Sequence, residues 1–114
     1  MESGDSYHGE VEVEGNDFHL FVERLVLRKE TISFHFTGRD DNGKFQVVDT
    51  ATKRSNDMWV APDAVVTYQP NGEPSHALFE FSAVREGSDE CLVNGSWKQT
   101  GNHWKFSGTI DRWP

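Results

Sequence analysis

Hydrophobic and polar residues alternate with period two along much of this chain. The stretch ISFHFTG, residues 32–38, places Ile32, Phe34 and Phe36 at alternate positions with polar side chains between them, and residues 77–84 repeat the arrangement. Successive side chains of a β-strand point to opposite faces, so this pattern is typical of a strand with one buried face. The chain is therefore expected to be rich in half-buried strands.

Eight segments carry the alternation or a close variant of it, and turns rich in Gly, Asn and Asp separate them. The predicted strands are Tyr7–Glu14, Phe18–Lys29, Thr31–Thr37, Lys44–Asp49, Val65–Gln69, Ala77–Val84, Glu90–Lys98 and His103–Asp111. Eight sequential antiparallel strands can close into a barrel, which removes the exposed edges of an open sheet. The 114 residues suffice for one hydrophobic core. The sequence therefore predicts an all-β fold with a single domain, residues 1–114, built as one antiparallel up-and-down β-barrel of about eight strands. A two-sheet β-sandwich is the alternative.

Two segments fit this scheme less simply. Phe18–Lys29 has apolar residues at helical spacing, but its β-branched and aromatic content favours a strand with a bulge at Glu23 and Arg24 over a short amphipathic helix. Residues 50–62 are predicted as the longest irregular connection. Within it, residues 58–61 form either a short strand or a lid packed by a tryptophan, because the proline that follows is a poor residue for a central strand.

The most patterned stretch of the chain, GSWKQTGNHWKFSG, is predicted to form a hairpin with Trp97 and Trp104 facing inward. A turn centred on Gly101–Asn102 is preferred, because glycine at the first position suits a type II′ turn. That register pairs Trp97 with Phe106. A turn centred on Thr100–Gly101 has the correct parity as well and would pair Trp97 with Trp104.

The spacing of glycine and aromatic residues here, G-x-W in one strand and W-x-F-x-G in the next, resembles the repeated hairpins of avidin-like and lipocalin-like barrels. The resemblance covers about the last quarter of the chain. The sequence lacks the Gly-x-Trp start motif of lipocalins near its N-terminus and a clear set of biotin ligands. The resemblance implies the architecture of a barrel and does not carry a function.

The chain is acidic, with 19 acidic residues, 11 Lys and Arg and a formal net charge of −8. Such a charge repels phosphate backbones, so we expect no nucleic-acid partner. The N-terminus has no apolar leader and the chain has no long apolar run, so we expect a soluble, cytoplasmic protein without a membrane partner. The single cysteine, Cys91, agrees with a reducing compartment. The sequence does not indicate the oligomeric state.

Residues with the chemistry for catalysis or metal binding are scattered. The five histidines lie singly in the sequence, and no serine or cysteine sits in a nucleophile motif. The segment 38–43 is rich in Asp and Asn, but it lacks the spacing of a calcium-binding loop and is predicted as a hairpin turn. We therefore expect no metal and no cofactor. An enzyme is the less favoured alternative, because strands can bring distant carboxylates together for acid-base catalysis.

The leading functional hypothesis is a non-enzymatic barrel that binds a small apolar ligand in an aromatic-lined cavity. Gly38, Gly95 and Gly108 fall on predicted inward faces, where they either leave space or allow the strands to coil tightly. The predicted ligand-binding residues are Phe34, Phe36, Phe79, Phe81, Trp97, Trp104 and Phe106, with Trp59 over the mouth of the cavity.

The alternative is an acidic interaction module, an inhibitor or adaptor for a basic partner protein. Glu10, Glu12 and Glu14 alternate with valines and would present three carboxylates from one strand face. A simpler interpretation is an edge strand that uses charge to prevent aggregation.

Overall fold

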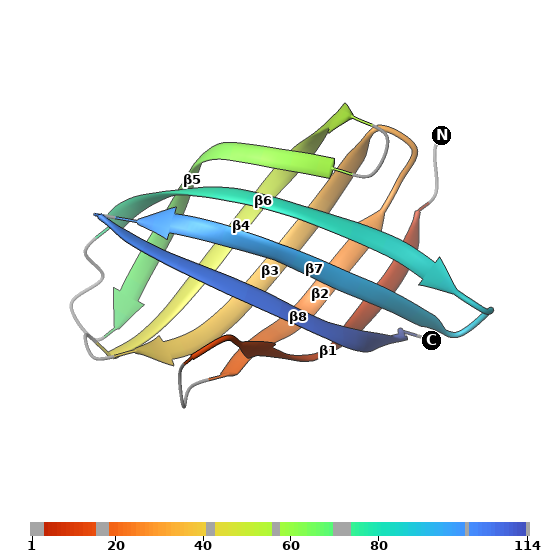
Figure 1. Ribbon diagram of the computed structural model, residues 1–114, viewed down its shortest axis with the longest axis horizontal. Helices are drawn as coiled ribbons and strands as arrows, with labels where there is room; N and C mark the ends of the chain where they lie inside the picture. Colours follow the sequence, from red (N-terminus) through yellow and green to blue (C-terminus); the bar gives the residue numbers. More distant parts are fainter. Residues whose placement is uncertain are drawn as a thin grey trace.

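The computed structural model describes residues 4–15, 19–40, 43–55, 58–69, 74–99 and 101–113 (Figure 1). Its strands are β1 (Asp5–Val13), β2 (His19–Leu27), β3 (Thr31–Asp40), β4 (Gly43–Ser55), β5 (Met58–Gln69), β6 (Pro74–Glu86), β7 (Glu90–Gln99) and β8 (Asn102–Arg112). Over these ranges, no helix has the length and apolar character needed to cross a membrane.

The eight strands form a closed antiparallel barrel in which each strand pairs with its neighbours in sequence. β1 and β8 close the barrel, with Tyr7 opposite Arg112 and Val13 opposite Phe106. The predicted up-and-down barrel is confirmed, and the sandwich alternative is wrong. Because the barrel is closed, β1 is not an edge strand, so its glutamates have no edge to protect.

The barrel has two ends, which we name after Trp104 and Asp5. The Trp104 end, at the left of Figure 1, carries the connections β1–β2, β3–β4, β5–β6 and β7–β8. The Asp5 end, at the right, carries the other three connections and both chain termini. Each connection therefore joins two neighbouring antiparallel strands at the same end of the barrel, as the short polar turns of the sequence predict.

The segment after residue 18 is a strand with a bulge, as predicted. Pairing between β2 and β3 shifts register between Val22 and Arg24, which leaves Glu23 as the extra residue. Val22 is buried before the bulge and Leu25 after it. Even-numbered residues of β2 therefore face the core before the bulge and odd-numbered residues face it after the bulge. Arg24 consequently points to the outer surface.

The predicted irregular connection at residues 50–62 is wrong. β4 continues to Ser55 and pairs with the start of β5, with Thr52 opposite Val60. Pro62 lies where the β5–β6 register shifts, so its missing N–H removes no regular ladder hydrogen bond. Trp59 is a buried wall residue of β5, 5% exposed, and is not a lid.

The inward side chains form one hydrophobic core, with phenylalanines at its centre. The ring centroids of Phe34 and Phe36 are 4.7 Å apart, and the centroid of Phe81 lies 5.4 Å from that of Phe34. A side chain at Gly95 would collide with Phe81. Gly95 therefore allows close approach of neighbouring strands, and Phe81 occupies the space beside it.

The register of the β7–β8 hairpin differs from the preferred prediction. Trp97 lies opposite Trp104 and Gln99 opposite Asn102, so the loop is Thr100–Gly101, of which Thr100 lies outside the described residues. Gly101 has a φ of 83°, which glycine adopts without strain. The preferred turn was wrong because the glycine is needed at the second loop position, and the alternative register is confirmed.

Candidate functional site

The predicted ligand-binding aromatics all belong to one hydrophobic core or, for Trp104, pack against it. Trp97 and Trp104 lie at the Trp104 end of the barrel, whereas Trp59, opposite Phe81, lies near the start of β5, toward the Asp5 end. Contacts between ring centroids of 4.7 to 6.4 Å connect Phe34, Phe36, Phe79, Phe81, Trp97, Trp104 and Phe106.

A stack of three rings leads from the core to the Trp104 end. Phe79 and Trp97 stack with centroids 5.8 Å apart, and Trp97 and Trp104 stack with centroids 5.0 Å apart. Trp97 is buried, whereas Trp104 is only partly buried against the core. The stack therefore ends in a half-exposed indole, which provides a flat apolar surface at this end of the barrel.

A hydrogen bond between two polar side chains lies beside this stack. Gln99 Nε2 donates to the Tyr68 hydroxyl at 2.9 Å, and Gln99 is 7% exposed. The two residues belong to β5 and β7, with β6 between them, so the bond crosses the inner face of β6. Phe45 contacts the Tyr68 ring with centroids 5.8 Å apart. Apolar rings and a polar pair thus meet at the Trp104 end.

Sequence reasoning missed Phe45, Tyr68 and Gln99 as site residues. The signal was present, because Gln99 shares the parity of inward Trp97 and Tyr68 shares that of inward Val66. A glutamine at an inward position of a barrel strand departs from an apolar core pattern. A search for polar residues at inward parity would have found it.

Ion pairs organise the Asp5 end. Asp5 accepts hydrogen bonds from Arg85 Nε at 2.8 Å and Arg112 Nη2 at 3.1 Å, which join β1, β6 and β8. Arg112 also donates to the Ser88 carbonyl. The hydrogen bond to Asp5 raises the pKa of the Arg85 guanidinium. These three residues, Asp5, Arg85 and Arg112, which we call the clamp, therefore hold together strands that are far apart in the sequence.

Two buried groups near this end have unusual surroundings. Within the described residues, the buried indole Nε1 of Trp59 meets no hydrogen-bond partner, and the Lys53 ammonium lies 5.5 Å from the Trp59 ring centroid. Burial raises the pKa of the Cys91 thiol to about 11. Cys91 faces inward, and its thiol stays protonated at neutral pH.

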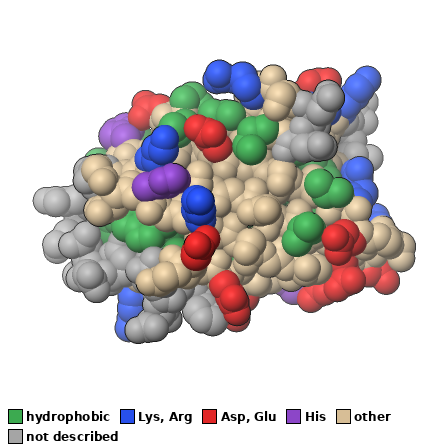
Figure 2. Space-filling model, viewed as in Figure 1, with side chains coloured by type: hydrophobic (Ala, Val, Ile, Leu, Met, Phe, Trp, Pro, Cys, Tyr) green, Lys and Arg blue, Asp and Glu red, His purple; other side chains and the backbone are tan. Residues whose placement is uncertain are grey.

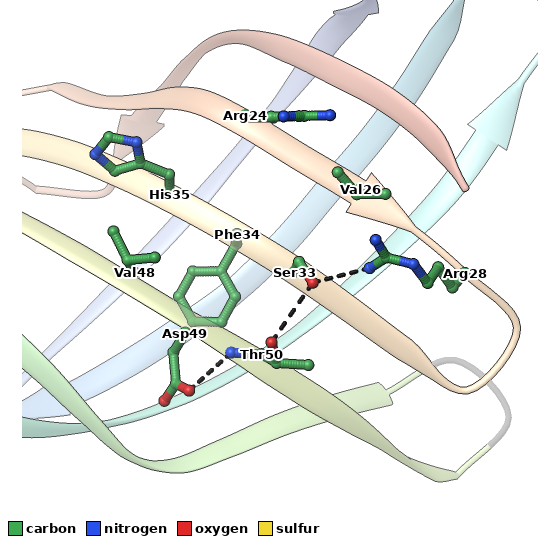
Figure 3. A pocket seen from close by; sticks show the side chains of 9 residues that line it. All are labelled: Arg24, Val26, Arg28, Ser33, Phe34, His35, Val48, Asp49 and Thr50. Atoms are coloured by element: carbon green, nitrogen blue, oxygen red, sulfur yellow. Dashed lines mark hydrogen bonds between the residues drawn. The ribbon is translucent and has the colours of Figure 1, made fainter. Parts of the chain in front are cut away.

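The outer surface of β2, β3 and β4 contains a hollow with a volume of about 370 Å³, which we call the outer hollow (Figure 3). Arg28 Nη1 donates to Ser33 Oγ at 2.8 Å, and Ser33 Oγ lies 3.5 Å from Thr50 Oγ1. Residues of all three strands line the outer hollow: Arg24, Val26, Arg28, Ser33, Phe34, His35, Val48, Asp49 and Thr50.

The polar residues singled out in the sequence lie on the outside. His35 is half-buried on the outer face of β3, where its Nε2 is 3.3 Å from Gln46 Oε1. In the part of the chain that the structure describes, no three His, Cys, Asp or Glu side chains gather to hold a metal ion. Asp41 and Asn42 of the predicted 38–43 turn lie outside the described residues, but β3 and β4 pair up to Asp40 and Gly43 as that hairpin requires.

Glu10, Glu12 and Glu14 are exposed along β1 and its end. On the face drawn in Figure 2, Asp and Glu side chains also gather at the right, the Asp5 end. Exposed acidic residues of the β6–β7 connection and the strands beside it lie at this end: Glu86, Asp89, Glu90 and Asp111. Binding of a basic partner by the β1 glutamates stays a prediction.

Comparison with known proteins identifies the architecture. No protein-family model and no curated protein matches the chain. Among solved structures, the chain is similar to a redesigned β-barrel, mFAP1, bound to DFHBI, with a TM-score of 0.52, 16% identity, and coverage of 94% of this chain and 92% of that one. It is also similar to EF1p2_mFAP2b bound to DFHBI, with a TM-score of 0.53, 14% identity, and coverage of 95% and 91%. At these identities, the similarity supports the barrel fold alone.

Proposed function

We propose that the protein binds a small, mostly apolar molecule at the Trp104 end of its barrel. The hydrogen bond from the buried Gln99 amide to the partly buried Tyr68 hydroxyl, beside aromatic rings, is the observation that carries this proposal. Burying an amide lowers stability unless it gains a hydrogen bond, so a purely structural core favours an apolar residue there. Small-molecule sites, by contrast, combine apolar walls with a few polar groups that orient the ligand.

Aromatic rings and polar groups would contact different parts of such a ligand. The half-exposed indole of Trp104, stacked on Trp97, offers a face for an apolar or aromatic group. The Gln99 amide, whose Nε2 donates to Tyr68, offers its carbonyl oxygen as an acceptor to a polar group on the same molecule. The packed phenylalanines below limit how deeply it enters. The two similar barrels bind DFHBI, which agrees with a small ligand in this architecture.

Native mass spectrometry of the protein purified from its own source tests the proposal first, because a co-purifying small mass would identify an occupant. Titration with the apolar probe 8-anilinonaphthalene-1-sulfonate, and separately with DFHBI, is then followed by tryptophan fluorescence. We expect saturable quenching that Trp104→Leu weakens about tenfold. The matched control is Trp113→Leu, which removes a 51% exposed indole at the Asp5 end.

Two results would contradict the proposal. The first is the absence of a bound mass together with tryptophan fluorescence that none of the probes quenches. The second is equal weakening by Trp104→Leu and Trp113→Leu, which would indicate nonspecific adsorption of the probe.

A further inference from the structure

We propose that the outer hollow is a second binding site, for the phosphoryl group of a small phosphate monoester. Arg24 lies on β2 and Arg28 directly follows that strand, four residues and about 13 Å further along the chain, and both line the outer hollow. In Figure 3 both guanidinium groups lie beside Val26, with the Ser33 and Thr50 hydroxyls on the neighbouring strands. The site is separate from the barrel interior and does not depend on the function proposed above.

Arg24 carries the strongest part of the argument. Among the described residues, it has no hydrogen-bond or ion-pair partner, although it lines a concave surface. Arg28, Arg85 and Arg112, by contrast, each donate to a side chain, Arg28 to Ser33 and the other two to Asp5. An unpaired guanidinium in a hollow retains all five N–H donors for an incoming anion.

Arg28 and the hydroxyls form a prearranged row of donors. Arg28 donates to Ser33 Oγ, so the Ser33 proton remains available to Thr50 or to a ligand oxygen. Thr50 is exposed and lies opposite Ser33 across the β3–β4 ladder. Because strand pairing fixes these positions, binding requires little rearrangement of the backbone.

The number and charge of these donors favour a phosphoryl group over a carboxylate. Two guanidinium groups and two hydroxyls exceed the hydrogen bonds that a single carboxylate accepts, whereas a phosphate offers three oxygens and nearly two negative charges. Asp49 lines the hollow but shares the inward parity of buried Val47, and its carboxylate accepts the Thr50 N–H at 2.7 Å. It therefore faces away from the arginines.

The remaining lining favours a small organic ester over a polymer. Val26 is 8% exposed and Val48 is 63% exposed, so an apolar group of the ligand can contact valines beside the charged donors. A volume of about 370 Å³ suits a small molecule. The net charge of −8 disfavours a long polyanion such as a nucleic acid.

An NMR titration of the full chain with phenyl phosphate at low ionic strength tests this inference. We expect saturable shifts of the Ser33, His35 and Thr50 amides, and roughly tenfold weaker binding in Arg24→Gln and in Arg28→Gln. Arg39→Gln is the matched control, because Arg39 is exposed on β3 outside the hollow. Benzoate, which has the same ring and a carboxylate, should bind more weakly.

Three results would overturn the inference: no saturable shift at millimolar phenyl phosphate, equal weakening by Arg24→Gln and Arg39→Gln, or benzoate binding as tight as phenyl phosphate. Because Arg24 is exposed, its replacement leaves the fold intact. The amide spectrum of each variant checks this directly.

Discussion

The two ends of the barrel close in different ways. At the Asp5 end, one carboxylate holds two arginines from strands that are far apart in sequence. At the Trp104 end, a stack of rings ends in a half-exposed indole beside an amide bonded to a phenol. Charge pairing fixes strands without offering an apolar surface, whereas rings with a polar pair offer one. In our proposal, the Asp5 end serves stability and the Trp104 end serves binding.

The comparison assumes that a tightly packed hydrophobic core separates the two ends of the barrel. Phe81→Ala tests this packing and has the largest expected effect on stability. Phe81 is fully buried and contacts Phe34, Phe36 and Phe106. We expect a loss of about 3 to 5 kcal/mol in the free energy of unfolding, measured with urea. Phe21→Ala, at a 46% exposed position on β2, is the control and should change little. A loss near 1 kcal/mol for Phe81→Ala would mean that the core is loosely packed.

The Asp5 end also holds a buried titrating group, and its pH response gives the second largest effect. The folded-state pKa of Cys91 is about 11, above its value of about 8.5 in an unfolded chain. The unfolded chain therefore loses the proton first as the pH rises. Stability present below about pH 8.5 should fall by about 3 kcal/mol by pH 11.

Urea unfolding of the protein and of Cys91→Ala between pH 8 and 11 isolates this contribution from other titrating groups. The difference between the two curves should shrink or change sign as the pH rises. Parallel curves would show that the Cys91 thiol titrates equally in the folded and unfolded chains.

The clamp itself gives a smaller effect. Asp5→Asn removes the charge that Arg85 and Arg112 share, and we expect a loss of about 1 kcal/mol because both arginines are about half exposed. The loss should diminish in 1 M salt. Asp63→Asn is the control, since its pair with His76 is more exposed and should contribute nothing measurable. Equal losses in the two variants would remove the distinction between the Asp5 end and ordinary surface.

Much of this molecule follows from alternation in the sequence, and the exceptions have physical causes. The eight strands and the β2 bulge were predicted because apolar parity reports directly which side chains are buried. The β4–β5 connection was misjudged because Pro62 suggests a break, and only the register shift shows how a strand tolerates it. The alternation of apolar residues did not determine the register of the β7–β8 hairpin, because both candidate registers place Trp97 on the inner face.

The candidate sites were harder to predict because they depend on contacts across strands. Tyr68 and Gln99 are 31 positions apart in sequence and meet only through the curvature of the barrel. Arg24 and Thr50 line the same hollow only because the β2 bulge turns Arg24 outward. Pairing registers, which a single sequence does not provide, determine both arrangements.

The smallest expected change in stability gives the sharpest test of the Trp104 end. Gln99→Leu replaces a buried amide with an apolar side chain of similar size, and Tyr68 is partly buried, so its hydroxyl can turn to water. We expect the free energy of unfolding to change by less than about 1 kcal/mol, while binding of the apolar probe weakens several-fold. Tyr68→Phe should weaken probe binding to a similar degree but lower stability more, because it leaves the buried Gln99 amide without its acceptor. If Gln99→Leu instead lowers stability by more than about 2 kcal/mol and leaves probe binding unchanged, the pair is a structural crosslink and the two ends both serve stability.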